Sequence, residues 1–424
     1  MLRAIKRRLY FLFARYFRFW ARIKLKKWSP KVIVVTGSAG KTTLLHMIES
    51  QLGSEAHYSH HANSAYGISY DILGLPGITK SRLQWLELFF KAPAAAFRPP
   101  YRKKIYVAEV DADRPNEAKF LAKLLRPAVT LWVSTLHTHT AQFDDVVQRG
   151  KYPSQEAAVA HEYGNLLEKT TDLVIINGDS ELMVKQAHRA SSKVAQVWLN
   201  QLKSYEPSAK FTKFTIDDEE YHIPALLPKM NFYQVAMVGQ LLKYLGKQPD
   251  RSFATFKLPP GRSSVLKGIK GITIIDSTYN NSNFDSLKGV VEMFEEYKAA
   301  QKWLVIGDLL EQGKNEEREH IKIAKLLNAT NLDHIILMGK RINKYTRPKL
   351  SDKLKQRTKI VSLDNPNQVL SYMENELKGG EAILFKGVGY MEVAIEKLLL
   401  HKEDTQNLVR RESIWQKKLA KLGL

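Results

Sequence analysis

The chain has 424 residues, of which 44% are hydrophobic and 25% are charged, values typical of a globular protein with roughly two or three domains. It contains no cysteine, which excludes disulfides, zinc–thiolate sites, iron–sulfur clusters and thiol catalysis. Half of the formal net charge of +22 lies within residues 1–31, which hold eleven lysines and arginines and no acid; the rest of the chain is only mildly basic, so we expect no nucleic-acid partner.

Residues 1–28 are predicted to form a basic, aromatic helix. Its longest uninterrupted apolar run, residues 9–14, is far shorter than the roughly 20 residues that span a membrane. The helix would carry an arginine face and an aromatic face, formed by Arg15, Arg18 and Arg22 and by Phe13, Phe17 and Trp20. This pattern favours a helix that lies on an anionic membrane surface. The alternative is that the aromatic face packs on the body of the protein itself.

A glycine-rich turn follows the first buried strand, which is predicted over 32–35. Residues 36–43 read Thr-Gly-Ser-Ala-Gly-Lys-Thr-Thr, and a helix is expected to begin near Thr42. The backbone amides of such a turn, together with the helix N-terminus, bind phosphate groups. Lys41 would reach the β- and γ-phosphates and the Thr42 hydroxyl would ligate Mg²⁺, so the motif predicts an ATP site rather than a glycine turn before an ordinary helix. The nucleotide-binding residues expected here are Gly37, Ser38, Ala39, Gly40, Lys41, Thr42 and Thr43.

Apolar strands alternate with helical patterns along the rest of the chain, which predicts parallel α/β architecture. Strands are expected over 32–35, 104–110, 129–134, 173–176, 272–276, 303–306, 334–338, 359–361 and 382–385. Segment 203–222 indicates an antiparallel excursion, and a helix over 231–246 leads to a hinge at 247–250. The predicted parts are an N-terminal helix (1–28), a central domain (29–250), a C-terminal domain (251–400) and a charged helical tail (401–424), whose helix is expected over about 402–422.

Six further motifs stand in the order in which one enzyme family carries them. They are Tyr106–Val110, Ser134–His139, Gly261-Arg262, Ile275–Asn280, Gly307–Gly313 and Phe385–Gly387. On these residues and the phosphate loop, the chain resembles the Mur ligase family of ATP-dependent acid–amino-acid ligases over residues 32–398. It looks most like the branch that adds D-alanyl-D-alanine to a peptidoglycan precursor. The resemblance implies a central ATP-binding domain with a P-loop-like parallel sheet and a Rossmann-like C-terminal domain.

The resemblance also assigns metal ligands near the predicted phosphate site. Glu109 and His139 would bind a second Mg²⁺, and both are expected near the carboxyl edge of the sheet, where α/β folds bind ligands. The alternatives are a solvated strand-end charge for Glu109 and a structural histidine for His139. With Lys41 and Arg262, these two residues form the expected catalytic set.

The second half of the chain would hold the rest of the nucleotide. The residues expected around it are Asn231, Gln234, Arg262, Asp276, Tyr279 and Asn280, with Lys386 and Asp308 as further candidates in the cleft. Arg262 would reach an ATP phosphate when the domains close, unless it forms a salt bridge at the domain boundary. Asp276 would bind the ribose hydroxyls, as strand-end carboxylates do in nucleotide folds. An N-cap is the alternative role for Asp308.

Three features depart from the family pattern. Only about 30 residues precede the phosphate loop, so the usual uridine-binding domain is not expected. Tyr163 stands where family members carry a carbamylated lysine that supplies an anionic oxygen to the second metal. Val388-Gly389 replaces a Ser-Arg pair, which removes an expected substrate contact.

We therefore expect an ATP-dependent ligase that activates a carboxylate as an acyl phosphate and then forms an amide bond. The expected partners are ATP, Mg²⁺, a muramoyl-peptide acceptor, and D-Ala-D-Ala or a related amine donor. Two alternatives stay open: a poly-amino-acid or other amide ligase of the same superfamily, and a non-catalytic ATP-binding scaffold at the membrane. The expected location is the cytoplasm, with the inner face of the plasma membrane as the surface that residues 1–28 would bind.

Overall fold

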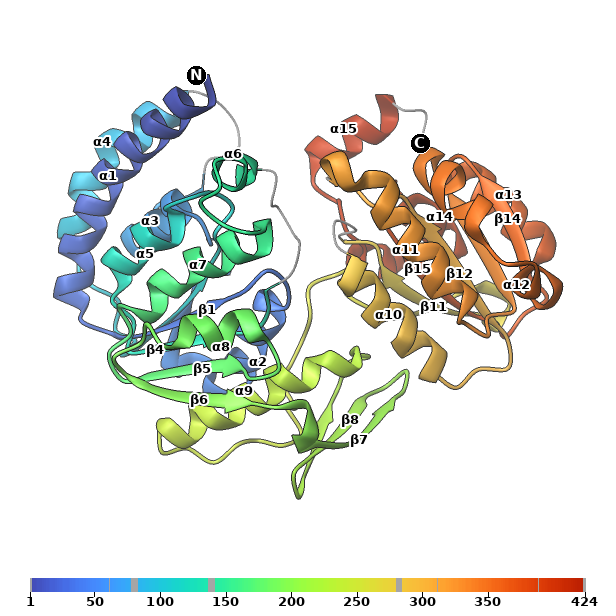
Figure 1. Cartoon of the computed structure of the whole chain (residues 1–424), viewed down its shortest axis with the longest axis horizontal. Helices are drawn as coiled ribbons and strands as arrows, with labels where there is room; N and C mark the ends of the chain where they lie inside the picture. Colours follow the sequence, from blue (N-terminus) through green and yellow to red (C-terminus); the bar gives the residue numbers. More distant parts are fainter. Residues whose placement is uncertain are drawn as a thin grey trace. The chain divides into compact units, whose positions relative to one another are not determined.

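The structure, a computed structural model, describes residues 2–60, 62–77, 83–135, 142–279, 284–310, 312–387 and 389–421. The chain divides into two compact units, the first formed by Met1–Leu202 with Phe232–Asp250 and the second by Lys203–Asn231 with Arg251–Leu424 (Figure 1). The domain limits predicted from the sequence differ in placing residues 203–231 in the central domain, and they stay a prediction. Among the described helices, none is long and apolar enough to cross a membrane.

The first unit is built on six parallel strands in the order β2-β3-β1-β4-β5-β6. They are β1 (Lys31–Thr36), β2 (Ala56–Tyr58), β3 (Ile105–Val110), β4 (Val129–Trp132), β5 (Leu173–Asn177) and β6 (Lys193–Val197). β1 lies inside the sheet and is buried from Val32 to Thr36, because its β-branched residues suit a strand that is covered on both faces. The strands predicted over 32–35, 104–110, 129–134 and 173–176 are confirmed, whereas β2 and β6 are not among the predicted strands.

Helices cover this sheet and connect its strands (Figure 1). They are α2 (Lys41–Leu52), α3 (Ala65–Leu73), α4 (Leu83–Phe97), α5 (Glu117–Leu125), α6 (Asp144–Gln148), α7 (Gln155–Leu167), α8 (Glu181–Ala187) and α9 (Phe232–Tyr244). One large apolar core lies between the sheet and the helices α3, α4, α5 and α7. α2 packs on α9 and on the sheet, which holds the start of α2 at the end of β1.

The N-terminal helix α1 (Leu2–Trp28) packs on the first unit, against α3 and α4. The side chains that it buries in the core recur about once per turn and are Ala14, Phe17, Ala21, Leu25 and Trp28. Tyr10 Oη also donates to Glu117 Oε1 (2.6 Å) in α5. The alternative of packing on the protein is therefore confirmed for one face of the helix. The predicted aromatic face is divided, since Phe17 is buried whereas Phe13 is exposed.

The second unit contains a mixed sheet in the order β10-β11-β15-β12-β13-β14, in which only β10 runs antiparallel to its neighbour. The strands are β10 (Ser264–Lys267), β11 (Thr273–Ser277), β12 (Lys302–Gly307), β13 (His334–Met338), β14 (Lys359–Leu363) and β15 (Ala382–Lys386). The helices are α10 (Phe284–Glu296), α11 (Glu316–Asn328), α12 (Asp352–Arg357), α13 (Pro366–Glu376) and α14 (Glu392–Leu398). The five strands predicted after residue 250 are confirmed, and β10 is an additional one.

The antiparallel excursion predicted over 203–222 is a small three-stranded sheet of the second unit. Its strands are β7 (Leu202–Pro207), β8 (Thr212–Ile216) and β9 (Glu219–Ile223), and β8 and β9 pair antiparallel. The helical tail differs from its prediction over 402–422. It consists of a 3₁₀ segment (Lys402–Asn407) and a separate helix α15 (Ser413–Lys421), joined by bends and irregular residues that include Arg410 at φ +60°.

Candidate active site

The turn between β1 and α2 has the backbone geometry of a phosphate-binding loop. Gly37 (φ +139°) and Gly40 (φ +81°) adopt conformations that side chains disfavour. Gly40 precedes the first residue of α2, Lys41, and caps the helix without any side-chain hydrogen bond. The amide groups at this N-terminus lack partners within the helix and carry partial positive charge. The loop therefore presents the type of surface that binds phosphate.

Two contacts hold this loop in shape and both need glycine. Ser134, which follows β4, accepts hydrogen bonds from Ser38 N (3.0 Å, to its carbonyl) and Ala39 N (2.8 Å, to its Oγ). A Cβ atom at Gly37 would lie 2.9 Å from Ser134 N, and one at Gly40 would lie 2.3 Å from the side chain of Gln234 in α9. The sequence motif thus serves close packing as well as ligand binding, and the structure places Gln234 beside the loop.

Lys41 is buried at the base of the loop. Its Nζ donates to Gly37 O (2.6 Å) and lies 3.1 Å from Asp111 Oδ2. Burial alone would lower the pKa of Lys41, but the nearby carboxylates of Asp111, Glu109 and Asp113 together raise this pKa above its ordinary value. Lys41 is consequently a permanent cation at neutral pH.

The carboxylates near Lys41 stand at the end of β3. β3 pairs with β1 in parallel, with Glu109 opposite Val35, so both strands end at the same edge of the sheet. Glu109 is buried, and its amide donates to Ser59 Oγ (2.8 Å). Asp111 follows the strand and was missed by sequence reasoning. Its position two residues after Glu109, on the same strand end, is the signal that could have found it.

Tyr163 occupies the place in α7 where the family pattern has a lysine. It is fully buried, and its Oη donates to Asp111 Oδ1 (3.4 Å). Burial, and then the negative charges of Asp111 and Asp113, raise the pKa of Tyr163 well above its ordinary value, so the hydroxyl keeps its proton. Tyr163 is therefore a neutral donor to Asp111, which also faces Lys41.

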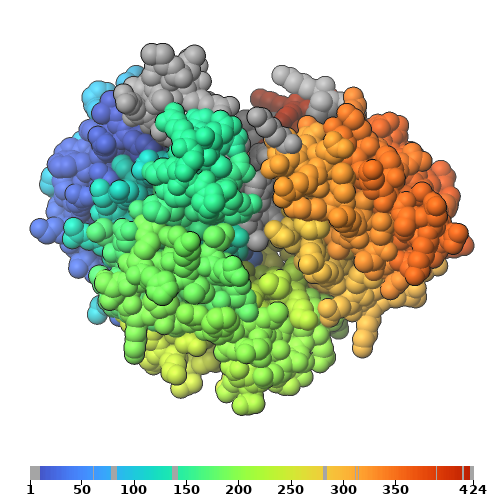
Figure 2. All heavy atoms as spheres, in the orientation of Figure 1, coloured from blue at the N-terminus to red at the C-terminus, as the bar shows by residue number. Residues whose placement is uncertain are grey.

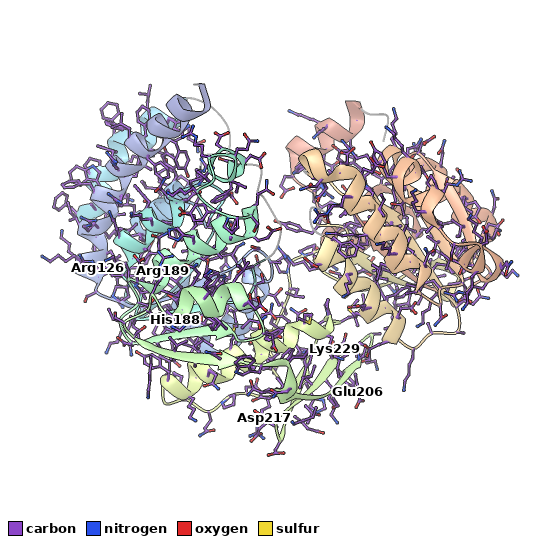
Figure 3. The ribbon with its side chains drawn as sticks, viewed as in Figure 1. Arg126, His188, Arg189, Glu206, Asp217 and Lys229 are labelled. Atoms are coloured by element: carbon purple, nitrogen blue, oxygen red, sulfur yellow. The ribbon has the colours of Figure 1, made fainter. Side chains whose placement is uncertain are left out.

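The helix that carries Tyr163 is fastened in its middle and at its C-terminal end. Arg189, after α8, donates to His161 O (2.8 Å) and to Glu168 Oε1 (2.6 Å) (Figure 3). Glu162, next to Tyr163, is buried and accepts from Asn116 N (2.8 Å) at Oε1. Burial raises the pKa of Glu162 to about 7.

The second unit collects several predicted residues around the ends of β11 and β15. Arg262 places its guanidinium carbon 4.3 Å from the ring centre of Tyr279. Asp276, at 0% exposure, accepts from both the amide (2.9 Å) and the hydroxyl (2.7 Å) of Thr278 at Oδ1. Burial raises the pKa of Asp276 to about 6. Tyr279 is half exposed.

Lys386 lies next to this group, because β15 pairs with β11 and sets Lys386 opposite Ser277. It is buried. Burial and the positive charge of Arg262 lower the pKa of Lys386 to about 8, against the opposing effect of Asp276. The second unit therefore holds a buried lysine whose proton is weakly bound.

The candidate Asp308 and the nearby His320 have structural contacts instead. Asp308 Oδ1 accepts from Ile342 N (2.8 Å), so it fastens the segment after β13 and does not cap the next helix in sequence, α11. His320 is fully buried, accepts from Leu309 N (3.2 Å), and contacts Glu316 O through Nδ1 (2.8 Å). These bonds hold the chain after β12 in place.

Three residues discussed from the sequence, His139, Asn280 and Val388, lie outside the described residues. Asn231 ends a 3₁₀ turn in the second unit, whereas Gln234 belongs to α9 in the first. Their joint role at the adenine stays a prediction.

Among the described residues, one cluster of histidine and acidic side chains could hold a metal ion. His46 and Glu49 of α2 and His60 after β2 place their ligand atoms within 4.8 Å of one another. Glu49 lies 3.0 Å from His60 Nε2 and 3.3 Å from His46 Nδ1, contacts that hydrogen bonds alone also explain.

Two family models match the chain. The Mur ligase middle domain covers residues 35–238, and the Mur ligase glutamate ligase domain covers residues 261–389. Two similar proteins are the UDP-N-acetylmuramoyl-tripeptide–D-alanyl-D-alanine ligases of Bacillus subtilis and Haemophilus influenzae. The first is 24% identical over 375 residues, which are 86% of this chain and 75% of the relative; the second is 21% identical over 397 residues, 91% and 79% of the two chains.

Solved structures give the same fold. The MurF ligase from Thermotoga maritima in complex with ADP has a TM-score of 0.69 at 19% identity, over 96% of this chain and 84% of that one. A MurF structure from Acinetobacter baumannii has a TM-score of 0.69 at 16% identity, over 89% and 78%. The predicted fold class, a parallel-sheet central domain followed by a Rossmann-like one, is confirmed.

Proposed function

The chain belongs to the Mur ligase family, and we propose that it is an ATP-dependent ligase that joins D-alanyl-D-alanine to a muramoyl-tripeptide acceptor. The observation that carries this proposal is the phosphate loop, in which the buried Lys41 lies 3.1 Å from Asp111 at the edge of the parallel sheet. We infer the substrates from the two relatives named above, which are both UDP-N-acetylmuramoyl-tripeptide–D-alanyl-D-alanine ligases.

The reaction would have two steps. The acceptor carboxylate attacks the γ-phosphorus of ATP, the bond to the bridging oxygen breaks, and an acyl phosphate and ADP form. The amine of D-Ala-D-Ala then attacks the acyl carbon, an amide bond forms, and phosphate leaves as the amine releases a proton. Lys41 would neutralise phosphate charge in the first step, because its pKa is raised and it stays protonated. The N-terminus of α2 would hold the phosphates.

Mg²⁺, when bound, would supply further neutralisation of phosphate charge. We propose that Thr42, Glu109 and Asp111 hold it, because hydroxyl and carboxylate oxygens are the ligands that Mg²⁺ prefers. In this proposal Asp111 provides the anionic oxygen that a carbamylated lysine provides in the family pattern, and Tyr163 orients Asp111 through its hydrogen bond. His139 stays a predicted ligand.

The second unit would bind the rest of the nucleotide. Arg262 is proposed to contact an ATP phosphate, and Asp276 the ribose, with Tyr279 and Asn280 beside them. Asn231 and Gln234 remain our candidates for the adenine. The contact of Arg262 with Tyr279 and the buried Asp276 support this proposal, because they set a cation and an acceptor at one edge of the sheet.

We also propose that the protein works in the cytoplasm, at the inner face of the plasma membrane. The support for a membrane surface is the face of α1 that the core leaves exposed, which carries Arg15, Phe19 and Arg22.

The test of the ligase is phosphate release with ATP, Mg²⁺, UDP-N-acetylmuramoyl-tripeptide and D-Ala-D-Ala. We expect release that needs both substrates and falls by at least about 1,000-fold in Lys41→Met, because the variant removes the fixed cation at the base of the phosphate loop. The matched control is Lys243→Met, which removes an exposed lysine from α9 of the same unit. Release with a different amine would indicate another amide ligase, and ATP binding without release would indicate a scaffold; either result contradicts the proposal.

A further inference from the structure

We propose that α1 and α4 together form a surface that binds an anionic lipid bilayer, and that a basic groove beside α1 takes the phosphate headgroups. This inference concerns where the protein is held and goes beyond the ligase reaction. We define the lipid-facing surface as the exposed apolar residues Leu12, Phe13 and Phe19 of α1 and Leu86, Phe90 and Phe97 of α4, with the cations around them.

These two helices expose apolar side chains that folding usually buries. Their exposed fractions run from 49% for Phe13 to 74% for Phe90. Six of the fourteen large hydrophobic residues that are exposed in the described part of the chain belong to α1 and α4. Scattered apolar residues need no explanation, but a concentration of this kind marks an interaction surface.

The exposed residues follow helical spacing. Leu12 and Phe19 are seven residues apart on α1, and Leu86 and Phe90 are four residues apart on α4, so each pair lies on one stripe of its helix. The opposite stripe of each helix faces the core, where Phe17 and Leu88 are buried. Each helix therefore has two apolar stripes, of which the protein covers one.

The two exposed stripes are joined across the seam between the helices. Tyr16 stacks on Phe89 with 3.9 Å between ring centres, and Trp20 meets Phe97 at 6.3 Å. Phe19 in turn contacts Trp20 (4.9 Å). Figure 1 shows the two helices side by side at the edge of the first unit, and in Figure 2 α1 lies at the molecular surface. The apolar surface is thus continuous from one helix to the other.

Cations surround this apolar surface. The exposed ones are Arg15, Arg22, Lys26 and Lys27 of α1, Lys91 of α4, and Arg98, which directly follows α4. α1 has no acid, and Glu87 of α4 pairs with Lys91. Lys27 Nζ lies 4.4 Å from the ring centre of the exposed Phe97. At a lipid interface, a long cation of this kind keeps its charge at the headgroup level while its stem lies along apolar groups. Anionic headgroups complement this charge.

A basic groove of about 600 Å³ continues the surface beyond Arg22. It is lined by Arg22, Lys123, Arg126, Glu168, Lys169, Thr170, Thr171 and Ser191 (Figure 3 labels Arg126). Its single acid, Glu168, is held by Arg189 at 2.6 Å, which leaves the cations to set the charge of the groove. Arginine forks and threonine hydroxyls are donors suited to a phosphate oxygen.

A bilayer fits this surface better than a second copy of the chain. Two copies meeting through α1 and α4 would bring the same cations together, and like charges at an interface cost several kcal/mol. Lipid phosphates instead neutralise these cations while the aromatic rings enter the interfacial region. The occupant to which we commit is therefore a bilayer with anionic headgroups.

Removing α1 is not a usable test, because Phe17, Leu25 and Trp28 are part of the core and Trp28 Nε1 donates to Lys103 O (2.6 Å). The test is flotation of the full chain with vesicles of phosphatidylglycerol and phosphatidylcholine, compared with phosphatidylcholine alone, without ATP. One double variant, Phe90→Ser/Phe97→Ser, changes α4 only. A second, Arg22→Gln/Arg126→Gln, changes the groove. The matched control, Phe211→Ser/Lys229→Glu, changes an exposed phenylalanine and an exposed lysine of the second unit.

We expect binding to the anionic vesicles only, weakened at least about tenfold by the phenylalanine variant. The arginine variant should weaken it about 30-fold, since each cation near such a surface contributes about fivefold. The control should bind like the original chain, and thermal unfolding should show all three variants folded. The proposal would be overturned by equal binding to neutral vesicles or by unchanged binding of both test variants. It would also be overturned by release of the vesicles by 10 mM inorganic phosphate at constant ionic strength, or by concentration-dependent dimers that mask the surface. Because no ATP is present, these results are independent of the ligase.

Discussion

Each unit buries one lysine at the edge of its sheet, and the two lysines are perturbed in opposite directions. Lys41 of the first unit faces Asp111 at 3.1 Å with Glu109 and Asp113 nearby, and its pKa is raised. Lys386 of the second unit shares its surroundings with Arg262, and its pKa falls to about 8. Burial lowers both pKa values. Neighbouring charge, and not the extent of burial, therefore decides whether a buried lysine keeps its proton.

This contrast suits the two roles that we propose. A lysine among three carboxylates is a fixed cation, so it can meet a polyphosphate without losing charge. A lysine beside an arginine binds its proton less firmly, and its pKa would rise when an anionic group binds nearby. Four substitutions test this contrast, in order of decreasing effect on the free energy of unfolding.

Asp111→Asn should have the largest effect, because it removes the charge closest to Lys41. Removing one partner of a buried ion pair costs about 3 kcal/mol in the free energy of unfolding. We expect the nucleotide-free variant to unfold at a lower temperature, and ADP to raise its midpoint more than that of the original chain, since phosphate replaces the lost charge. Calorimetry with and without ADP measures both. A variant as stable as the original would show that Asp111 does not stabilise the positive charge of Lys41.

Replacing each lysine by methionine should change stability in opposite directions. The folded-state pKa of Lys386, about 8, lies below its value of 10.5 in the unfolded chain, so its charge costs stability fully below pH 8, and this cost disappears as pH rises toward 10.5. Lys386→Met should therefore be more stable at pH 7 by about 2 kcal/mol, with a smaller gain at pH 9.5. Lys41→Met should be less stable, because it leaves carboxylates unneutralised.

Urea denaturation at the two pH values checks both variants. If both lysine variants lose stability at pH 7, the contrast between the units is wrong.

Glu162→Gln extends the comparison to a buried acid. The pKa of Glu162 is about 7 in the folded chain and 4.5 in the unfolded one, so stability falls as pH rises from 4.5 to 7 and the cost is fully present above pH 7. The amide oxygen of glutamine can still accept from Asn116 N. We expect a gain of about 1 kcal/mol at pH 8 and almost none at pH 5. A gain that is equal at the two pH values would point to packing instead of charge.

The sequence predicted the strands that lie inside the two sheets, since a continuous apolar run such as Val32–Val35 is typical of a strand buried on both faces. Of the edge strands of these two sheets, it predicted only β14. It did not predict β2, which has only three residues, or β6, whose first residues are exposed at the sheet edge. β10 was missed because it is short and runs antiparallel beside β11. Edge strands bury less apolar surface, so their sequences carry a weaker pattern.

The candidate site, like the fold, could be predicted only in part. Lys41 and Glu109 could be found because each sits in a motif directly after or within a buried strand. The position of Asp111 two residues after Glu109 could have marked it as a candidate. Its role, however, depends on contacts with Lys41 and Tyr163, which are distant in sequence. The composition of α1 likewise favoured a helix on a membrane surface and left packing on the protein as the alternative, whereas only the tertiary structure shows that Phe17 is buried.

The most direct test of the account is mass spectrometry of the products formed from ATP, UDP-N-acetylmuramoyl-tripeptide and D-Ala-D-Ala. We expect a new species that contains both peptide substrates joined with loss of one water, formed in equal amount with ADP and phosphate, and absent with Lys41→Met. ATP consumption without the joined species, or the same yield of it with Lys41→Met, would contradict the proposal that the phosphate loop of the first unit drives amide synthesis.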